Sequence, residues 1–596
     1  MRGYFGFSAS SVDSYPNSGN FKTLRQIQRL FLSSLLVSSV TLFAAFNMSP
    51  LFAAEVTCSQ LLTLILQHKD KLVGQMTQVS YGDSKNLNLT IYDTEIARIL
   101  QGGYNSDTHL QVENLLLASR SFDIPVRENG AVVAAPTTGG YGKAIWIRDL
   151  ARVFDGLLAL ERRDDAKKVA KAILQAMTTP QQIQRLHANI LDPDLHRSGG
   201  DEQMNVLHIR MSAEDFGPVL VNVDGIKQEE KWNHKQNDAL ALSFLSVLSA
   251  FREGLLTSED LDPSERQYLA ALPSYFERLS FWQKWDGGAW EEGNGLRVSS
   301  LALVTKVFEE LINMQAAQTK EAFALLIQKE VAGGSYPNDV PEWVKKTHQI
   351  STLKLAKEEG LKKIRKLLTR GESPDDENKD RHRGADAALA HLFWYPLDDL
   401  TETEYRLILA HVLSLARGSG VIRYKDDLYL HTLYYYGRPH SETLVPQEFF
   451  EGDRPIKLGE ISEVFHPRQP RRAEELFGKD LEPQWSIHYP ILARAGLFMY
   501  KKFGRHQYLD LAEVSTLYAF ASVTPATELP SLDGSFVAQR KIPESRSPFW
   551  ITRREDGRIK ERFQVMVPSN NTPLYWAVAE VARMNREWAK FRKQRL

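Results

Sequence analysis

Cysteine is almost absent from this chain, because Cys58 is the only one among 596 residues. No intrachain disulfide can therefore form in any compartment. A cysteine nucleophile needs a neighbouring base, and the position of Cys58 at the edge of the predicted domain argues against that role. Cys58 could carry a lipid anchor, but Thr57 stands where such sites have a small residue, so a plain unpaired thiol is favoured.

An excess of charge of either sign is also absent, since 73 basic residues face 74 acidic ones. This balance gives no reason to expect a nucleic acid partner. The sequence has no His or Cys cluster at zinc spacing, no glycine-rich phosphate loop and no Gly-x-Ser-x-Gly elbow. We therefore expect no metal and no cofactor.

The N-terminus has the outline of an export signal. Basic residues Lys22, Arg25 and Arg29 precede an uncharged stretch, residues 30–54. We expect residues 1–54 to be cleaved from an exported protein that is periplasmic or secreted; the alternative is a membrane anchor through residues 30–54. Residues 55–94 then form an N-terminal arm, in which residues 87–92 alternate like a short strand, and residues 95–596 form the main domain.

Long strands are scarce, and apolar residues recur at helical spacing over most of the chain. This periodicity predicts helices at 148–160, 165–177, 237–251, 264–281, 299–314, 403–415, 489–503, 509–522 and 572–591. Long loops rich in Gly, Pro and aromatics separate them at 133–147, 191–235, 284–297, 418–484 and 523–570. No motif repeats as in a solenoid, so we predict an all-α, closed helical toroid with its functional loops at one end. Residues 343–383, rich in Lys and Glu, predict an exposed helix followed by a loop.

One turn combines two carboxylates with an indole: Trp290, Glu291 and Glu292 lie between glycines in residues 286–295. A glycosidase needs a carboxyl group that stays protonated near neutral pH, and an apolar neighbour such as Trp290 raises a carboxyl pKa. Taken alone, two glutamates at a helix start are more often a solvated pair.

Two further segments place polar and aromatic residues at helix starts. Trp146, Arg148 and Asp149 form one group, in which the aromatic ring can stack on a sugar and the charged pair can bind its hydroxyls. The alternative is a helix start stabilised by Asp149 and paired with Arg148. Residues 231–238 are polar before an apolar helix, which favours a pocket lining over simple capping by Asp238.

The order of these motifs resembles glycoside hydrolase family 15, the glucoamylase family, which is related to the N-terminal part of phosphorylase kinase regulatory subunits. The similar motifs, spread over residues 95–595, are Trp146-Ile-Arg148-Asp149, Trp232 with Gln236 and Asp238, Trp290-Glu291-Glu292, Arg423-Tyr424 with Asp427 and Tyr429, and Trp485-Ser486. The resemblance implies an (α/α)6 toroid and no metal.

The resemblance also implies a role for each matching residue. Glu291 matches the general acid and Glu292 the residue that binds the leaving sugar. Arg148, Asp149 and Arg423 match residues that grip the terminal glucose, Trp146 and Trp232 match its aromatic floor, and Asp238 belongs to the substrate-binding set. The base is expected before Trp485, where Glu463 is preferred over Glu460, Glu474 and Glu475. Tyr141 lies five residues before Trp146, farther than the family pattern.

The implied activity is inverting hydrolysis that releases glucose from the non-reducing ends of α-glucan oligosaccharides. A phosphorylase-kinase-like sugar-binding or regulatory module is the alternative, and an enzyme for another α-linked sugar such as trehalose is a third reading. No separate starch-binding domain is visible, so soluble oligosaccharides are the expected substrates. We expect a monomer, with no membrane contact beyond the signal or anchor.

Overall fold

The computed structural model describes most of the chain after residue 57. The chain divides into two units, 1–50 and 51–596, and only the second contains described residues. No helix in the described part is both long and apolar enough to cross a membrane. The described residues are 58–137, 140–196, 206–223, 226–230, 232–291, 294–316, 321–374, 382–425, 427, 450–451, 454–455, 482–555 and 558–595.

Six helical elements form a closed inner ring. Each packs against the next in chain order, and the last packs against the first. Their facing sides supply most of one large hydrophobic core. The inner elements are α6 (Ile147–Ala159), α9 (Asn237–Arg252), α11 (Val298–Ala316), the 3-10 helix η8 (Ala387–Phe393), α19 (His488–Phe503) and α21 (Tyr575–Arg595).

An outer layer of helices returns the chain between inner elements. Four of the outer helices (α7, α14, α15 and α20) pack against the inner element that precedes them, whereas α10 packs on α7 and α11, and α5 contacts α21 through the rings of His109 and Trp588. Side-chain caps fix where some of them begin: Asp262 and Glu265 form a capping box at one start, as do Thr401 and Glu404 at another. The outer helices are α5 (Ser106–Ala118), α7 (Arg163–Met177), α10 (Pro263–Arg278), α14 (Ile350–Leu368), α15 (Glu402–Leu413) and α20 (His506–Ala521).

Alternation of inner and outer helices gives the inner elements a common direction. The chain therefore enters each inner element at the same end of the ring. The motifs of Trp146, Trp232, Trp290 and Trp485 lie just before or at these starts, and the Arg423 motif follows the outer helix α15, so the ring gathers most of them into one place.

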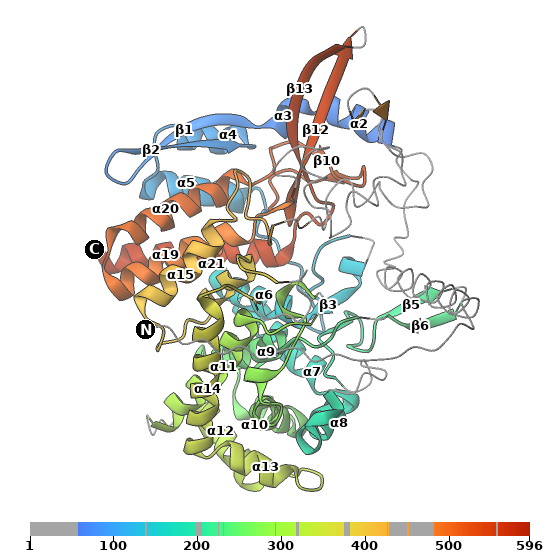
Figure 1. The fold of residues 1–596 in the computed structure, drawn as a ribbon, viewed down its shortest axis with the longest axis vertical. Helices are drawn as coiled ribbons and strands as arrows, with labels where there is room; N and C mark the ends of the chain where they lie inside the picture. The colour runs from blue at the N-terminus through green and yellow to red at the C-terminus, as the bar shows by residue number, and fades with distance from the viewer. Residues whose placement is uncertain are drawn as a thin grey trace, which may run out of the picture. The chain divides into compact units, whose positions relative to one another are not determined.

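The remaining elements lie outside the ring. Strands β1 (Gln75–Tyr81) and β2 (Lys85–Ile91) pair antiparallel, and β2 packs on α20 (Figure 1). A long hairpin of β12 (Ser545–Glu555) and β13 (Arg558–Pro568) is drawn in red at the top of Figure 1. Other helices are α2 (Cys58–Gln67), α3 (Lys69–Val73), α4 (Thr94–Leu100), α8 (Pro180–Leu191), α12 (Ala322–Gly333) and α13 (Val340–Thr347), and other strands are β3 (Ala144–Trp146), β4 (Arg210–Ser212), β5 (Leu220–Val223), β6 (Ile226–Glu229), β7 (Phe450–Glu451), β8 (Arg454–Pro455), β9 (Gln484–Trp485), β10 (Leu529–Pro530) and β11 (Phe536–Val537).

The all-α toroid is confirmed, as are the nine predicted helices and the strand at residues 87–92. Two expectations are wrong. Residues 523–570 contain the β12–β13 hairpin, although the sequence predicts a loop there. Helix α14 is not a fully solvated helix, because Leu353, Ala356 and Ile364 are buried and it packs along α11. Charged residues on its other face concealed this apolar stripe.

The contact that closes the ring supplies a stability test. A Cβ on Gly156 of α6 would lie 2.4 Å from Cβ of Ala579 and 2.6 Å from its Cα. Gly156→Ala should lower the free energy of unfolding by about 1–3 kcal/mol, because the two backbones must separate. Thermal and urea unfolding would measure the loss.

Gly333 is the control, since it is also a helical glycine, at the last position of α12, but a Cβ there meets nothing within 4 Å. Gly333→Ala should leave the unfolding midpoint unchanged or raise it slightly. Equal midpoints for the two variants would show that the α6–α21 contact does not depend on glycine.

Candidate active site

The turn that carries Glu291 is closed by backbone hydrogen bonds. Asp286 and Gly295 exchange N–H···O bonds of 2.9 and 2.8 Å, which bring the ends of the turn together. Gly288 has φ +59°, a conformation that glycine adopts without strain. Glu291 itself has φ +60°, which is unusual for a residue with a side chain and indicates that the surrounding contacts fix it.

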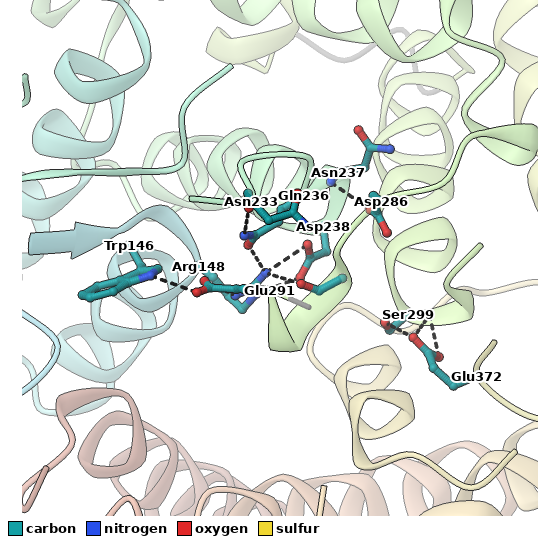
Figure 2. Close-up of polar contacts among 11 residues, drawn as sticks. Trp146, Arg148, Asn233, Gln236, Asn237, Asp238, Asp286, Glu291, Ser299 and Glu372 are labelled. Atoms are coloured by element: carbon teal, nitrogen blue, oxygen red, sulfur yellow. Dashed lines mark hydrogen bonds and ion pairs between the residues drawn. The ribbon is translucent and has the colours of Figure 1, made fainter. Parts of the chain in front are cut away.

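The carboxylate of Glu291 is held at both oxygens. Trp146 Nε1 donates to Oε2 at 3.2 Å, and Arg148 Nη1 donates to Oε1 at 3.3 Å (Figure 2). The side chain is 16% exposed, so solvent reaches it at one edge. Burial raises the pKa of Glu291 above its ordinary value, against the opposing charges of Arg148 and Arg210. A buried carboxyl with a raised pKa can act as a proton donor.

Trp290 faces a different part of the site than the sequence predicts. Its indole N–H donates to Asp386 Oδ1 at 2.8 Å, and its ring lies 5.9 Å from that of Trp485. The indole that contacts the acid belongs to Trp146 instead. Trp290 therefore anchors the turn to the start of η8, because the left-handed backbone of Glu291 directs the two neighbouring side chains to different partners.

Arg148 joins three segments of the site. Its guanidinium is 2% exposed and donates to Asp238 from Nε at 2.7 Å and from Nη2 at 3.1 Å. Nη2 also donates to Gln236 Oε1 at 2.6 Å and to the carbonyl oxygen of Gly288 at 3.1 Å (Figure 2). Arg148 thus ties α6 to the start of α9 and to the Glu291 turn.

Asp149 is the second acidic group of the α6 start. Burial, with the nearby carboxyls of Glu291 and Glu544, raises its pKa to about 8, and Arg148 opposes this shift. Its side chain is partly exposed, unlike that of Asp238. Asp149 is therefore available to a sugar hydroxyl, whereas Asp238 is fully buried and committed to Arg148.

Aromatic rings line the same region. Trp146 lies 6.1 Å from Trp232 and 5.2 Å from Tyr141, measured between ring centroids. Tyr141 lies within the 3-10 helix η2 (Gly140–Gly142), which precedes β3, and its side chain is half-buried despite its longer separation from Trp146 in the sequence. The structure thus brings together the two tryptophans that the resemblance assigns to the floor.

Arg423 is a further buried cation near Trp290. It makes a bidentate ion pair with Asp427, with N–O distances of 2.6 and 2.7 Å. Its guanidinium lies 5.2 Å from the ring centroids of both Trp290 and Trp485. Aromatic rings on two sides and a fork-shaped ion pair hold this cation rigidly at the site.

Several expected residues lie outside the described part of the chain. Glu292, assigned to the leaving sugar, is one of them. The preferred base Glu463 and its alternatives Glu460, Glu474 and Glu475 are the others.

A second buried carboxyl, which the sequence analysis missed, belongs to Glu544. Asn571 Nδ2 donates to its Oε2 at 2.7 Å, and the Tyr141 hydroxyl donates to Oε1 at 3.4 Å. Glu544 is 2% exposed, and burial raises its pKa to about 7. Tyr141 also contacts Trp146, which contacts Glu291, so one chain of side chains links the two carboxyls.

The sequence contains a signal for Glu544, although it is weak. The resemblance implies a base before Trp485, whereas Glu544 follows Trp485 and precedes another helix start with aromatics, Tyr575-Trp576. What sets its position is tertiary: Ser545 pairs with Trp485 between β12 and β9, and Ser486 N donates to the carbonyl oxygen of Glu544.

One group among the described residues has metal-like composition: His208, His234 and Glu229, whose ligand atoms lie within 4.8 Å of one another. The two imidazole rings are stacked at 4.0 Å with an angle of 10°. Parallel rings cannot both direct an in-plane lone pair at one ion about 2.0–2.1 Å away. Burial, His208, Arg210 and Arg185 lower the pKa of His234, and the two arginines would repel a cation. This arrangement does not suit a metal.

A cavity of about 340 Å³ lies elsewhere, between α11, α12 and α13. Its lining is mainly apolar and includes Leu311 and Met314, near the C-terminal end of α11. The Glu291 turn precedes the opposite end of this helix, so the cavity is separate from the acid site.

Known proteins similar to this chain include one curated relative and several solved structures. The chain is 27% identical over 206 residues to the "Uncharacterized lipoprotein YgeQ" of Escherichia coli (strain K12), covering 33% of this chain and 77% of that protein. Among solved structures, it is similar to "Glycosidase Wild Type" (16% identity, 82% and 99% of the two chains, TM-score 0.44) and to the glucoamylase from Saccharomycopsis fibuligera (14% identity, 92% and 99%, TM-score 0.38).

Residues 123–332 match the sequence model of glycosyl hydrolases family 15. The matched segment includes Trp146, Arg148, Asp238 and Glu291, and ends before Arg423 and Glu544. The resemblance found from the motifs is confirmed over residues 123–332, which are similar to glycosyl hydrolases family 15, and this match supports a glycoside hydrolase.

Proposed function

We propose that the protein is an exo-acting, inverting α-glucoside hydrolase that releases glucose from the non-reducing ends of α-glucan oligosaccharides. The observation that carries this proposal is a pair of buried carboxyls, Glu291 and Glu544, at the common end of the inner helices. Both have raised pKa values, and both are held by aromatic donors. Two carboxyls are what inverting hydrolysis of a glycosidic bond requires.

Glu291 is the proposed proton donor to the glycosidic oxygen. Its partly exposed edge lets a substrate oxygen approach, while Trp146 and Arg148 fix the carboxyl on the other side. The donors also stabilise the carboxylate that remains after the proton has left.

Glu544 is the proposed base that activates the attacking water. It belongs to a loop before β12, on a different segment from the acid, and Asn571 and Tyr141 orient it. Inverting enzymes place such a base about 6.5–9.5 Å from the acid, leaving space for water. Glu463 remains the alternative base predicted from the sequence.

The pair works when it shares one proton. The pKa of Glu544 is about 7, so near neutral pH it titrates easily, and the positive charge of Arg423 favours its anion. Positive charge that develops on the sugar ring would favour that anion further. The productive state has the proton on Glu291 and none on Glu544.

The remaining site residues are proposed to bind the terminal glucose. Asp149 offers a partly exposed carboxyl, and Trp146 and Trp232 offer ring faces. Arg423 is buried beside Trp290 and Trp485 and borders the same space. Arg148 and Asp238 contribute mainly by holding the site together, since each is at most 2% exposed.

We also propose that the protein is exported. The basic and uncharged N-terminal segment supports this, and so does the E. coli relative, which is named a lipoprotein. Soluble α-glucan oligosaccharides that enter the cell envelope are then the proposed substrates.

Glu291→Gln should lower kcat on maltooligosaccharides or isomaltooligosaccharides by about 10²–10⁴-fold, because glutamine cannot donate the proton. The unmutated protein should release β-glucose, which proton NMR detects before mutarotation. Ligand binding by the unmutated protein with no hydrolysis would instead favour the regulatory module. A substrate panel that includes trehalose would identify an enzyme for another α-linked sugar.

The two candidate bases can be separated by paired substitutions. Glu544→Gln should lower kcat by about 10²–10⁴-fold with little change in the affinity for glucose, because only water activation is lost. Glu463→Gln is the control, and we expect its kcat to stay within a few-fold of the parent. The reverse outcome would assign the base to Glu463.

The raised pKa of Glu544 also predicts how the stability of the protein depends on pH. Its pKa in the folded protein, about 7, lies above the roughly 4.3 of an unfolded glutamate. Its protonation therefore stabilises the fold fully below that unfolded pKa, and this contribution is lost as pH rises through about 7. Glu544→Gln keeps an oxygen for Asn571 and should lose less stability than the parent between pH 5 and pH 8, by on the order of 1–3 kcal/mol.

Urea unfolding at both pH values measures this difference. Replacing Glu544 also lowers the pKa of Asp149, which Glu544 helps to raise, and this change acts in the same direction, so the difference reports Glu544 together with its effect on Asp149. If the free energies of unfolding of parent and variant change equally between the two pH values, ionising Glu544 costs the folded protein little free energy.

A further inference from the structure

Arg210 lies against the ring of Trp146, and none of the sequence motifs includes it. It is directly opposite Trp146 in the antiparallel pairing of β3 and β4. Its guanidinium carbon lies 4.8 Å from the ring centroid of Trp146 and 4.3 Å from that of Trp232. The cation therefore lies against both rings of the proposed sugar floor.

This cation is deeply buried and has few partners. Arg210 is 2% exposed, and its Nη1 donates to Glu230, while its Nε has no hydrogen-bond partner among the described residues. Burying a guanidinium with one counter-ion is costly, and an apolar side chain of the same length would avoid the cost. The packing of Trp146 and Trp232 alone does not require a charge there.

The charge instead affects the acid through Trp146. A cation over the face of an indole withdraws electron density and makes its N–H a stronger donor. That N–H donates to Oε2 of Glu291. The guanidinium, which lies over the ring of Trp146, therefore strengthens this hydrogen bond.

We propose that Arg210 is a positioning residue for Glu291, which acts through Trp146 and through its own charge to keep the acid oriented and ready to release its proton. The inference rests on the proposed role of Glu291 as proton donor. Glu230 moderates Arg210, because its carboxylate neutralises part of the guanidinium charge.

The charged groups around Glu291 fix the sign of the effect. Arg148 and Asp149 face it from α6 and Arg210 from β4; the arginines favour the anion and Asp149 opposes it. Asp238 is neutralised by its ion pair with Arg148. Loss of Arg210 must therefore raise the pKa of Glu291, and loss of Glu230 must lower it.

The experiment titrates Glu291 in the full-length protein without turnover. Tryptophan fluorescence is recorded against pH, and the same curve from Glu291→Gln is subtracted, so that the difference reports ionisation of the carboxyl bonded to Trp146. Arg210→Met, of similar length, should move the midpoint upward by on the order of one pH unit, and Glu230→Gln should move it downward by about half a unit. Arg210→Lys, which keeps the charge, should restore most of the shift.

The pH profile of kcat/KM is the second measurement. One limb of this profile should have its apparent pKa at the fluorescence midpoint. In each variant that limb should move in the same direction as the midpoint. Lower kcat or a lower melting temperature with an unmoved midpoint in Arg210→Met would overturn the proposal and leave a structural role. If Arg210→Met does not fold, the Glu230→Gln shift decides alone. If the parent protein hydrolyses nothing while the midpoints still shift, the proposed function fails and the coupling of Arg210 to Glu291 stands.

Discussion

The buried guanidinium of Arg148 is the contact on which the rest of the site depends. It binds Asp238 and Gln236 at the start of α9, the carbonyl oxygen of Gly288 and the carboxylate of Glu291. An unpaired arginine at this depth would be strongly destabilising, so each partner is held in place by the need to satisfy the charge. The geometry of the acid turn is therefore a consequence of helix packing in the inner ring rather than of the turn sequence alone.

The common direction of the inner helices explains how one region accommodates so many acids. Burial raises the pKa of Asp149 and Glu372 to about 8, and that of Asp286 and Glu544 to about 7. Helix starts carry partial positive charge, and their free N–H groups donate to such carboxylates: Asn237 N donates to Asp286, and Ser299 N to Glu372 (Figure 2). Arg148, Arg210 and Arg423 supply the full positive charges. The large core of the ring offsets the cost of burying them.

Local patterns predicted most of the scaffold, because helical periodicity and capping are properties of short segments. The sequence did not predict the apolar stripe of α14 or the β12–β13 hairpin, and the two reasons differ. Charges on the exposed face concealed the first, and pairing between distant strands produced the second. The role of Arg210 was not predicted for a similar reason, since Arg210 pairs with Trp146 across two strands that are far apart in the chain.

The sequence by itself determined the helical toroid and the identity of Trp146, Arg148, Asp149, Trp232 and Glu291 as one group, because each belongs to a short motif at a helix start. Only the tertiary structure decided which side chain faces which. It turned Trp290 toward Asp386 and Trp146 toward Glu291, and it brought Glu544 to Tyr141 across 403 positions of sequence. Side chains that meet only when the ring of helices closes leave no periodic signal in the sequence, because their contact depends on helix packing and not on residue spacing.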